Sequence, residues 1–292
     1  MSDLSAEDLK ALADVGISEE EAGKQLELLR HPPAPTRVDR PCTPGDGIQR
    51  VTESEADALI ARHEAAEREG RFTKFVPASG AASRMCKSLN RYLEQLDEEG
   101  EAPVSEDAAR LRREGPRFAF WEQLVAEVER RGGDPESEAD LVRGLLRPDG
   151  LGFGAKPKGL IPFHRYPEGA RTAFAEHLFE APDYVRDAAG VCRASFTVPP
   201  ETRQEFRERL EASREAVRKR HGSEFEVSFS VQDSSTDTLA IDREGRPFRL
   251  ASGELLLRPG GHGALLNNLE ALQADCVLIK NIDNVLPESK RE

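Results

Sequence analysis

One local pattern recurs along this chain: a short apolar segment, then a loop of small residues, then an amphipathic helix. The clearest case is an extended segment at 73–78, a small-residue loop at 79–83 and a helical period from 84 to 96. Further apolar segments lie at 191–198, 225–231 and 276–279. Because parallel strands need long crossovers between them, strands that alternate with helices predict an α/β fold with a mainly parallel sheet.

Helix signals dominate the first 70 residues. Three Ser or Thr residues are each followed three positions later by an acidic residue, which is the spacing of a capping box. These pairs are Ser5 with Asp8, Ser18 with Glu21, and Thr52 with Glu55. We therefore expect a helical N-terminal extension over 1–70, then an α/β domain over 71–292 with a charged helical insertion at about 87–150.

The second half of the chain has fewer clear boundaries. The pattern predicts one helix over 168–188, in which Arg171 and His177 are interpreted as surface or capping residues. Residues 242–245 resemble a hairpin turn, and 255–257 predict a further strand. The tail 287–292 is charged and shows no regular pattern.

Charge and cysteine content limit the function classes. A net charge of −13 argues against broad binding to nucleic acid or anionic membranes, which needs a basic face. No apolar run approaches the ~20 residues of a membrane span, and no secretory signal is visible at the N-terminus. The four cysteines are scattered without a Cys-x-x-Cys pair, which favours a reducing cytoplasm over a disulfide or zinc framework.

The loop after the first predicted strand is the first candidate site: Ser79, Gly80, Ala81, Ala82, Ser83 and then Arg84. Small residues let backbone N–H groups approach an anion, and the following helix N-terminus favours negative charge. Arg84 could bind a phosphate with two N–H groups. The loop matches neither the Walker A nor the Gly-x-Gly-x-x-Gly pattern, and an ordinary strand-to-helix turn is the alternative.

Three further segments carry candidate residues. Lys156 and Lys158 flank a rigid proline that could aim a charge at a phosphate, although most lysines are simply solvated. Gly261, His262 and Gly263 follow a predicted strand, where glycines allow close approach to a base or ribose or simply make a tight connection. Asp283 follows the apolar segment 276–279, where a carboxylate could hold Mg²⁺ or form a common Asp/Asn turn.

Gln232 lies on an extended segment between Lys158 and Gly261. With it, the order of these segments resembles that of the UTP-dependent sugar-1-phosphate uridylyltransferases, or UDP-sugar pyrophosphorylases. More closely, residues 74–85 (KFVPASGAASRM), 232–238 and 258–285 resemble a bacterial domain family of unknown function that covers nearly the whole chain. The resemblance implies a Rossmann-like nucleotidyltransferase fold. Lys158 lies 74 residues beyond Arg84, much farther than in those enzymes, so residues 87–150 are read as an insertion.

The resemblance also implies a reaction. A nucleotidyl group, expected to be uridylyl, passes from a nucleoside triphosphate to a sugar 1-phosphate, and pyrophosphate leaves. On this interpretation Arg84 and Lys158 stabilise phosphate charge and residues 79–83 bind the phosphates. Gln232 and residues 261–263 border the base and ribose, and Asp283 holds Mg²⁺.

Alternatives stay open from the sequence alone. One is a nucleotide-binding protein on the same fold without catalysis; another is an interaction protein that works through the acidic helices 1–70 and 97–150. Because little sequence follows Asp283, we interpret the domain as C-terminally incomplete, with the sugar half missing. The other possibility is a minimal domain completed by a partner chain or a second copy, with strand 276–280 beside an open sheet edge.

Overall fold

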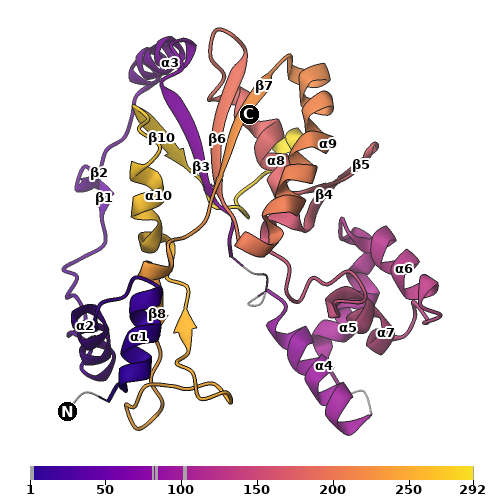
Figure 1. The fold of residues 1–292 in the computed structure, drawn as a ribbon. Coiled ribbons are helices and arrows are strands. Elements are labelled where there is room, and N and C mark those ends of the chain that lie inside the picture. The colour runs from indigo at the N-terminus through magenta and orange to yellow at the C-terminus, as the bar shows by residue number, and fades with distance from the viewer. Residues whose placement is uncertain (1–2, 81, 83–84, 101–103, 292) are drawn as a thin grey trace. The chain divides into compact units, whose positions relative to one another are not determined.

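The computed structural model describes residues 3–80, 82, 85–100 and 104–291. Its contacts divide the chain into two compact units (Figure 1). The first comprises residues 1–66 and 232–273, and the second comprises 67–231 and 274–292. Residues 232–273, expected within the α/β domain, group with the N-terminal helices, and the division into an extension over 1–70 and a domain over 71–292 stays a prediction. Each unit is described below by itself.

The described α-helices are α1 (Ala6–Asp14), α2 (Glu19–Arg30), α3 (Glu53–Arg68), α4 (Lys87–Glu99), α5 (Glu106–Glu114), α6 (Trp121–Arg130), α7 (Glu138–Leu146), α8 (Ala173–Glu180), α9 (Arg203–His221) and α10 (Leu266–Glu270). The described strands are β1 (Thr43–Pro44), β2 (Gly47–Ile48), β3 (Phe72–Pro77), β4 (Pro162–Tyr166), β5 (Gly169–Thr172), β6 (Val191–Thr197), β7 (Glu224–Ser230), β8 (Thr238–Leu239), β9 (Leu257–Arg258) and β10 (Cys276–Ile279).

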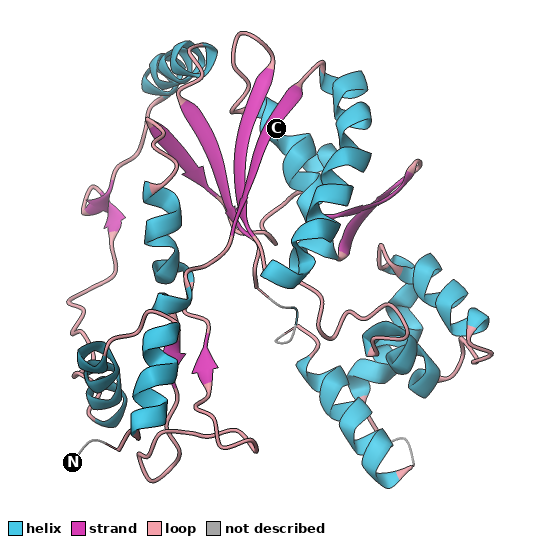
Figure 2. Cartoon of the chain, viewed as in Figure 1, coloured by secondary structure: helices cyan, strands magenta, loops and turns pink. Residues whose placement is uncertain are grey.

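The second unit contains a four-stranded sheet in the order β10-β3-β6-β7, and all three neighbouring pairs are parallel. The prediction of an α/β fold with a mainly parallel sheet is confirmed. β10 pairs only with β3 among the described strands and forms one edge of the sheet, as expected. Helices α8 and α9 lie on one face of this sheet (Figure 2).

Alternation along the strands explains that packing. Successive side chains of a strand point to opposite faces, so Cys192, Ala194 and Phe196 of β6 share the face that α8 and α9 cover. The ring centroid of Phe174 on α8 lies 4.6 Å from that of Phe196 and 5.2 Å from that of Phe206 on α9, both in edge-to-face geometry. Such pairs favour one fixed arrangement of helix and sheet.

Helices α4 to α7 form a separate apolar core within the second unit. Buried Leu96, Leu111, Leu124 and Leu141 come one from each helix. The region predicted as a helical insertion is therefore helical, although its role as an insertion into a nucleotidyltransferase stays a prediction.

The first unit packs α1 and α2 against short strands. Leu12, Ile17 and Leu26 bury their side chains with Leu239 of β8, which pairs antiparallel with β9. The predicted capping box at Ser5 is confirmed, because the Ser5 and Asp8 side chains each accept a hydrogen bond from the other residue's backbone N–H. None of the described helices combines the length and the apolar character needed to cross a lipid bilayer.

Two of three expectations about local structure are wrong. The helix expected over 168–188 is a β-hairpin strand followed by α8, because Gly169 has a φ of +128° and Thr172 caps α8. The strand expected at 255–257 is present as β9 (Leu257–Arg258), which pairs antiparallel with β8. The tail is ordered, with a 3-10 turn over Glu288–Lys290.

Candidate active site at the carboxyl edge of the sheet

The order of the strands marks one place on the sheet. From β3 the chain continues to β6 on one side, and β10 returns to the other side of β3. In open parallel sheets, ligands bind outside the carboxyl ends of the strands where the order reverses in this way. The segments that leave β3 and β10 at that edge are residues 78–86 and 280–285.

The loop after β3 is tied to the segment that carries Lys158. The backbone N–H of Lys158 donates to the carbonyl of Gly80 at 3.1 Å, and the N–H of Ala82 donates to the carbonyl of Lys156 at 3.2 Å. Ala82 is fully buried, so its small side chain is a packing requirement here. These hydrogen bonds bring together Gly80 and Lys158, two candidates that are far apart in the sequence.

Lys158 and Asp283 meet at the same edge. The Lys158 Nζ lies 2.5 Å from an Asp283 carboxylate oxygen, and the two side chains are 27% and 43% exposed. Exposed ion pairs contribute only about 0–1 kcal/mol to folding. The two charged groups are therefore accessible to a ligand, and their ion pair contributes little to the free energy of folding.

Helix α8 supports the backbone of the loop that carries Asp283. The Nε2 of His177 lies 3.2 Å from the carbonyl oxygens of both Asn281 and Ile282. Burial, assisted by the charge of Lys74, holds the pKa of His177 well below its usual value, so the ring is neutral and Nε2 carries the donated proton. His177 is fully buried, and its expected surface role is wrong.

Two lysines lie next to this histidine: Lys74 is fully buried, whereas 26% of the Lys280 side chain is exposed. Lys74 is fully buried on β3, where its Nζ donates to the His177 carbonyl at 2.9 Å and lies 3.4 Å from the Glu180 carboxylate. Lys280 pairs with the other oxygen of the same carboxylate. Burial raises the pKa of Glu180, but the charges of Lys74 and Lys280 outweigh it and leave that pKa below its usual value.

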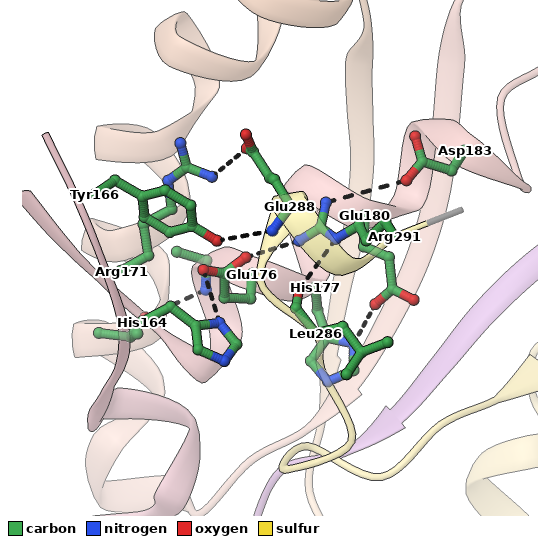
Figure 3. A network of polar contacts seen from close by, with 12 residues as sticks. His164, Tyr166, Arg171, Glu176, His177, Glu180, Asp183, Leu286, Glu288 and Arg291 are labelled. Atoms are coloured by element: carbon green, nitrogen blue, oxygen red, sulfur yellow. Dashed lines mark hydrogen bonds and ion pairs between the residues drawn. The ribbon is translucent and has the colours of Figure 1, made fainter. Parts of the chain in front are cut away.

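The tail after Asp283 packs onto the same helix (Figure 3). Arg291 donates to the fully buried carboxylate of Glu176 at 2.7 Å, and His164 approaches the other oxygen of that carboxylate at 3.1 Å. The Glu288 carboxylate binds Arg171. The tail supplies the charges that make a buried carboxylate on α8 tolerable, which explains why it is ordered.

The sequence analysis missed Lys74, Glu176, Glu180 and Lys280, and it interpreted Arg171 and His177 as surface or capping residues. Arg171 is only 8% exposed. No clear local signal was available: Glu176, His177 and Glu180 lie on one side of α8 (AFAEHLFE), as in a helix with a solvated face. Only the structure shows that all eight residues are buried, so that the Glu and His side chains need buried partners.

The residues predicted to border the base and ribose belong to the first unit. Gln232 follows β7, and its amide donates to the Thr236 hydroxyl at 3.2 Å. A Cβ on Gly260 would lie 2.9 Å from the Thr236 carbonyl, so this glycine permits close packing of the two segments. Gly261 and Gly263 have open space where a side chain would project, and His262 begins a 3-10 turn. Their binding of base and ribose stays a prediction.

Three of the candidates, Ala81, Ser83 and Arg84, lie outside the described residues. Ser79 is half-buried and Gly80 exposed at the mouth of the loop.

The side chains near Asp283 limit the kind of Mg²⁺ site that the chain could form. Among the described residues, no group of three or more His, Cys, Asp or Glu side chains is placed to hold a metal ion. Mg²⁺ often binds through one or two carboxylates, with phosphate oxygens and water completing its shell. The single carboxylate of Asp283 fits that kind of site and does not fit a metal held by protein alone.

Comparisons with known proteins place the chain as follows. No curated protein shows a significant match to the sequence. Among solved structures, the chain is similar to the uridine diphosphate N-acetylglucosamine pyrophosphorylase from Trypanosoma brucei, crystallised with an inhibitor, with 15% sequence identity and a TM-score of 0.39. That match covers 80% of this chain and 37% of the other, so the chain spans little more than a third of that protein. A protein family described as a domain of unknown function, DUF4301, matches residues 5–292, and the chain belongs to this family.

Proposed function

We propose that the chain is a nucleotidyltransferase that passes a nucleotidyl group, expected to be uridylyl, from a nucleoside triphosphate to a sugar 1-phosphate. The observation that supports it best is the accessible pair of Lys158 and Asp283 at the strand-order reversal. The backbone N–H of Lys158 also donates to Gly80 in the small-residue loop after β3. A cation, a carboxylate and a backbone loop at this position suit a phosphate chain.

The reaction needs positioning more than a protein nucleophile. An oxygen of the acceptor phosphate attacks the α-phosphorus, the bond from that phosphorus to the bridging oxygen breaks, and pyrophosphate leaves with the bond's electron pair. Lys158 stabilises charge on the α-phosphate, and residues 79–83, with Arg84 on sequence grounds, hold the two outer phosphates. Mg²⁺, when bound at Asp283, supplies further neutralising charge to phosphate oxygens.

A cavity of about 540 Å³ beside this loop suits the acceptor. Its wall includes Cys86 and Ile161, whose N–H groups donate to the carbonyls of Ala82 and Lys158 at 3.0 and 3.1 Å. Four phenylalanine rings line it and could cover the C–H face of a sugar ring; they are Phe118, Phe120, Phe153 and Phe163. We propose that the helices α4 to α7, with the segment 153–163, supply the acceptor pocket.

The experiment combines binding with turnover. Nucleoside triphosphates are titrated by calorimetry with Mg²⁺, and pyrophosphate release is followed with a panel of sugar 1-phosphates. Lys158→Met is expected to lower turnover by about 100-fold or more, the scale of losing one preorganised charge contact. Lys156→Met is the matched control, because Lys156 is two positions away, similarly exposed at 33%, and paired with Glu205 instead.

Three outcomes separate the possibilities. Pyrophosphate release that depends on Lys158 and not on Lys156 supports the proposal. Nucleotide binding without release under any acceptor supports the non-catalytic alternative. Absence of both, or equal loss in the two lysine variants, contradicts the assignment of the site.

A further inference from the structure

A second cavity, of about 600 Å³, lies between β5, α8 and α9, and none of its residues belongs to the candidate active site. Its floor is apolar, from Ala170, Ala175, Phe179, Ala212 and Ala216. Its polar residues are mainly cationic: Arg171, Arg209, Lys219 and Arg220, against the single carboxylate of Glu168. We call this cavity the basic groove.

The charge of the basic groove is unusual for this chain. The whole sequence carries a net charge of −13, yet four cations and one anion line this cavity. Arg209 and Lys219 form no ion pair with any carboxylate in the part of the chain that the structure describes. Two cations of the groove therefore have no counter-ion among the described residues.

Arg171 is held in a fixed orientation. Its guanidinium carbon lies 4.0 Å from the centroid of the Tyr166 ring and 3.6 Å from that of the Phe179 ring, and the residue is only 8% exposed. A guanidinium fixed between two rings is a preorganised donor for a phosphate or carboxylate. Such a buried cation also requires an anionic partner.

Two carboxylates supply that partner in this structure: Glu168, 2.7 Å from the Arg171 guanidinium, and Glu288 of the tail. Glu288 binds both Arg171 and Arg220 through its two carboxylate oxygens, and its backbone N–H donates to the Tyr166 hydroxyl at 3.3 Å. Glu288 is five residues after Asp283. One carboxylate from the tail thus occupies two of the four cations of the basic groove, as a phosphate group from outside could.

We propose that the basic groove binds a soluble small molecule that carries a phosphate group on an apolar body, and that this phosphate competes with Glu288 for Arg171 and Arg220. The phosphate charge matches the cations, and the apolar body matches the alanine and phenylalanine floor. The volume lies in the range of small-molecule sites. This site is independent of the proposed transfer reaction and needs no turnover to be tested.

Phenyl phosphate is the probe, titrated by calorimetry and by ³¹P NMR line broadening on the full chain. Arg209→Gln is expected to weaken binding about tenfold, because it removes an exposed cation of the groove. Arg207→Gln is the matched control: it is exposed on the same helix, two positions away, and does not line the groove. Glu288→Gln is expected to tighten binding at least fivefold, since it removes the internal competitor.

The proposal is overturned by absence of phenyl phosphate binding, by equal binding in Arg209→Gln and Arg207→Gln, or by weaker binding in a folded Glu288→Gln. Since Arg209 is exposed, its variant tests the groove even if Glu288→Gln fails to fold. Two further probes decide the ligand class. Inorganic phosphate should bind more weakly than phenyl phosphate, and binding to phosphatidic acid vesicles without binding to phenyl phosphate would assign the groove to a lipid surface instead.

Discussion

Replacing Lys74 by methionine tests the buried charge network beneath the candidate site. The Lys74 side chain is fully buried on β3, and Glu180, its carboxylate partner, is also paired with Lys280. Methionine has a similar volume and no charge, and in the variant Glu180 keeps one cationic partner. The variant thus removes a buried charge without leaving its partner carboxylate uncompensated.

The size of the effect follows from the pKa of Lys74. Burial lowers it from 10.5 to about 7, against the opposing attraction of Glu180. Between these two values the unfolded chain binds a proton that the folded protein does not, so the free energy of unfolding rises with pH by up to about 1.4 kcal/mol per unit. Below pH 7 both states are protonated, and the wild type has lost this contribution.

Methionine at this position does not titrate. We therefore expect the variant's stability, relative to the wild type, to fall by about 2 kcal/mol between pH 7 and pH 9, because Lys74 is half protonated at pH 7 and the full slope is reached only above it. Urea unfolding at pH 6, 7, 8 and 9 measures the difference directly. Groups remote from Lys74 titrate equally in both proteins and cancel. The pKa values of Glu180 and His177 respond to the Lys74 charge, but both groups titrate below pH 7, outside the range where the difference is expected.

Lys87→Met is the control, because Lys87 is exposed and its replacement should give a difference that does not change with pH. A constant difference between Lys74→Met and wild type over the same range would show that Lys74 stays protonated in the folded protein. The reasoning about burial and the charge network would then be refuted.

Three further variants probe the candidate site. Asp283→Asn should change the free energy of unfolding by less than about 1 kcal/mol, because its ion pair is exposed, while Mg²⁺-dependent nucleotide affinity falls at least tenfold; a large loss of stability in urea unfolding would count against it. His177→Gln should speed amide hydrogen exchange in residues 281–284, and unchanged exchange would remove His177 as their support. Gly159→Ala should cost about 1–3 kcal/mol, because its Cβ would lie 2.8 Å from the Phe206 ring; an unchanged urea midpoint would contradict this.

The elements that the sequence predicted well depend on near neighbours. The strands β6, β7 and β10 lie at the apolar runs 191–198, 225–231 and 276–279. The capping box at Ser5 was predicted from two residues three positions apart. These signals concern a few consecutive residues, so they can be read before any tertiary contact is known. The parallel sheet followed from them because crossovers of this length leave few other arrangements.

The hairpin β4-β5 was missed because local signals alone do not distinguish its turn from the start of a helix. Its turn residues were read as the start of a long helix, and only the pairing of Tyr166 with Gly169 across the hairpin decides against that. The strands β8 and β9, at two residues each, are too short to give a period at all.

The candidate site was decided by tertiary structure. Lys158 and Asp283 are 125 residues apart in the sequence, and Lys74 and Glu180 are 106 apart. A lysine in an apolar strand does not show whether it is solvated or buried, because that depends on a carboxylate brought from another element. The local pattern of the sequence determined which segments become strands and helices, whereas the long-range packing of α8 and the tail on the sheet determined which charges are paired, buried or left accessible to a ligand.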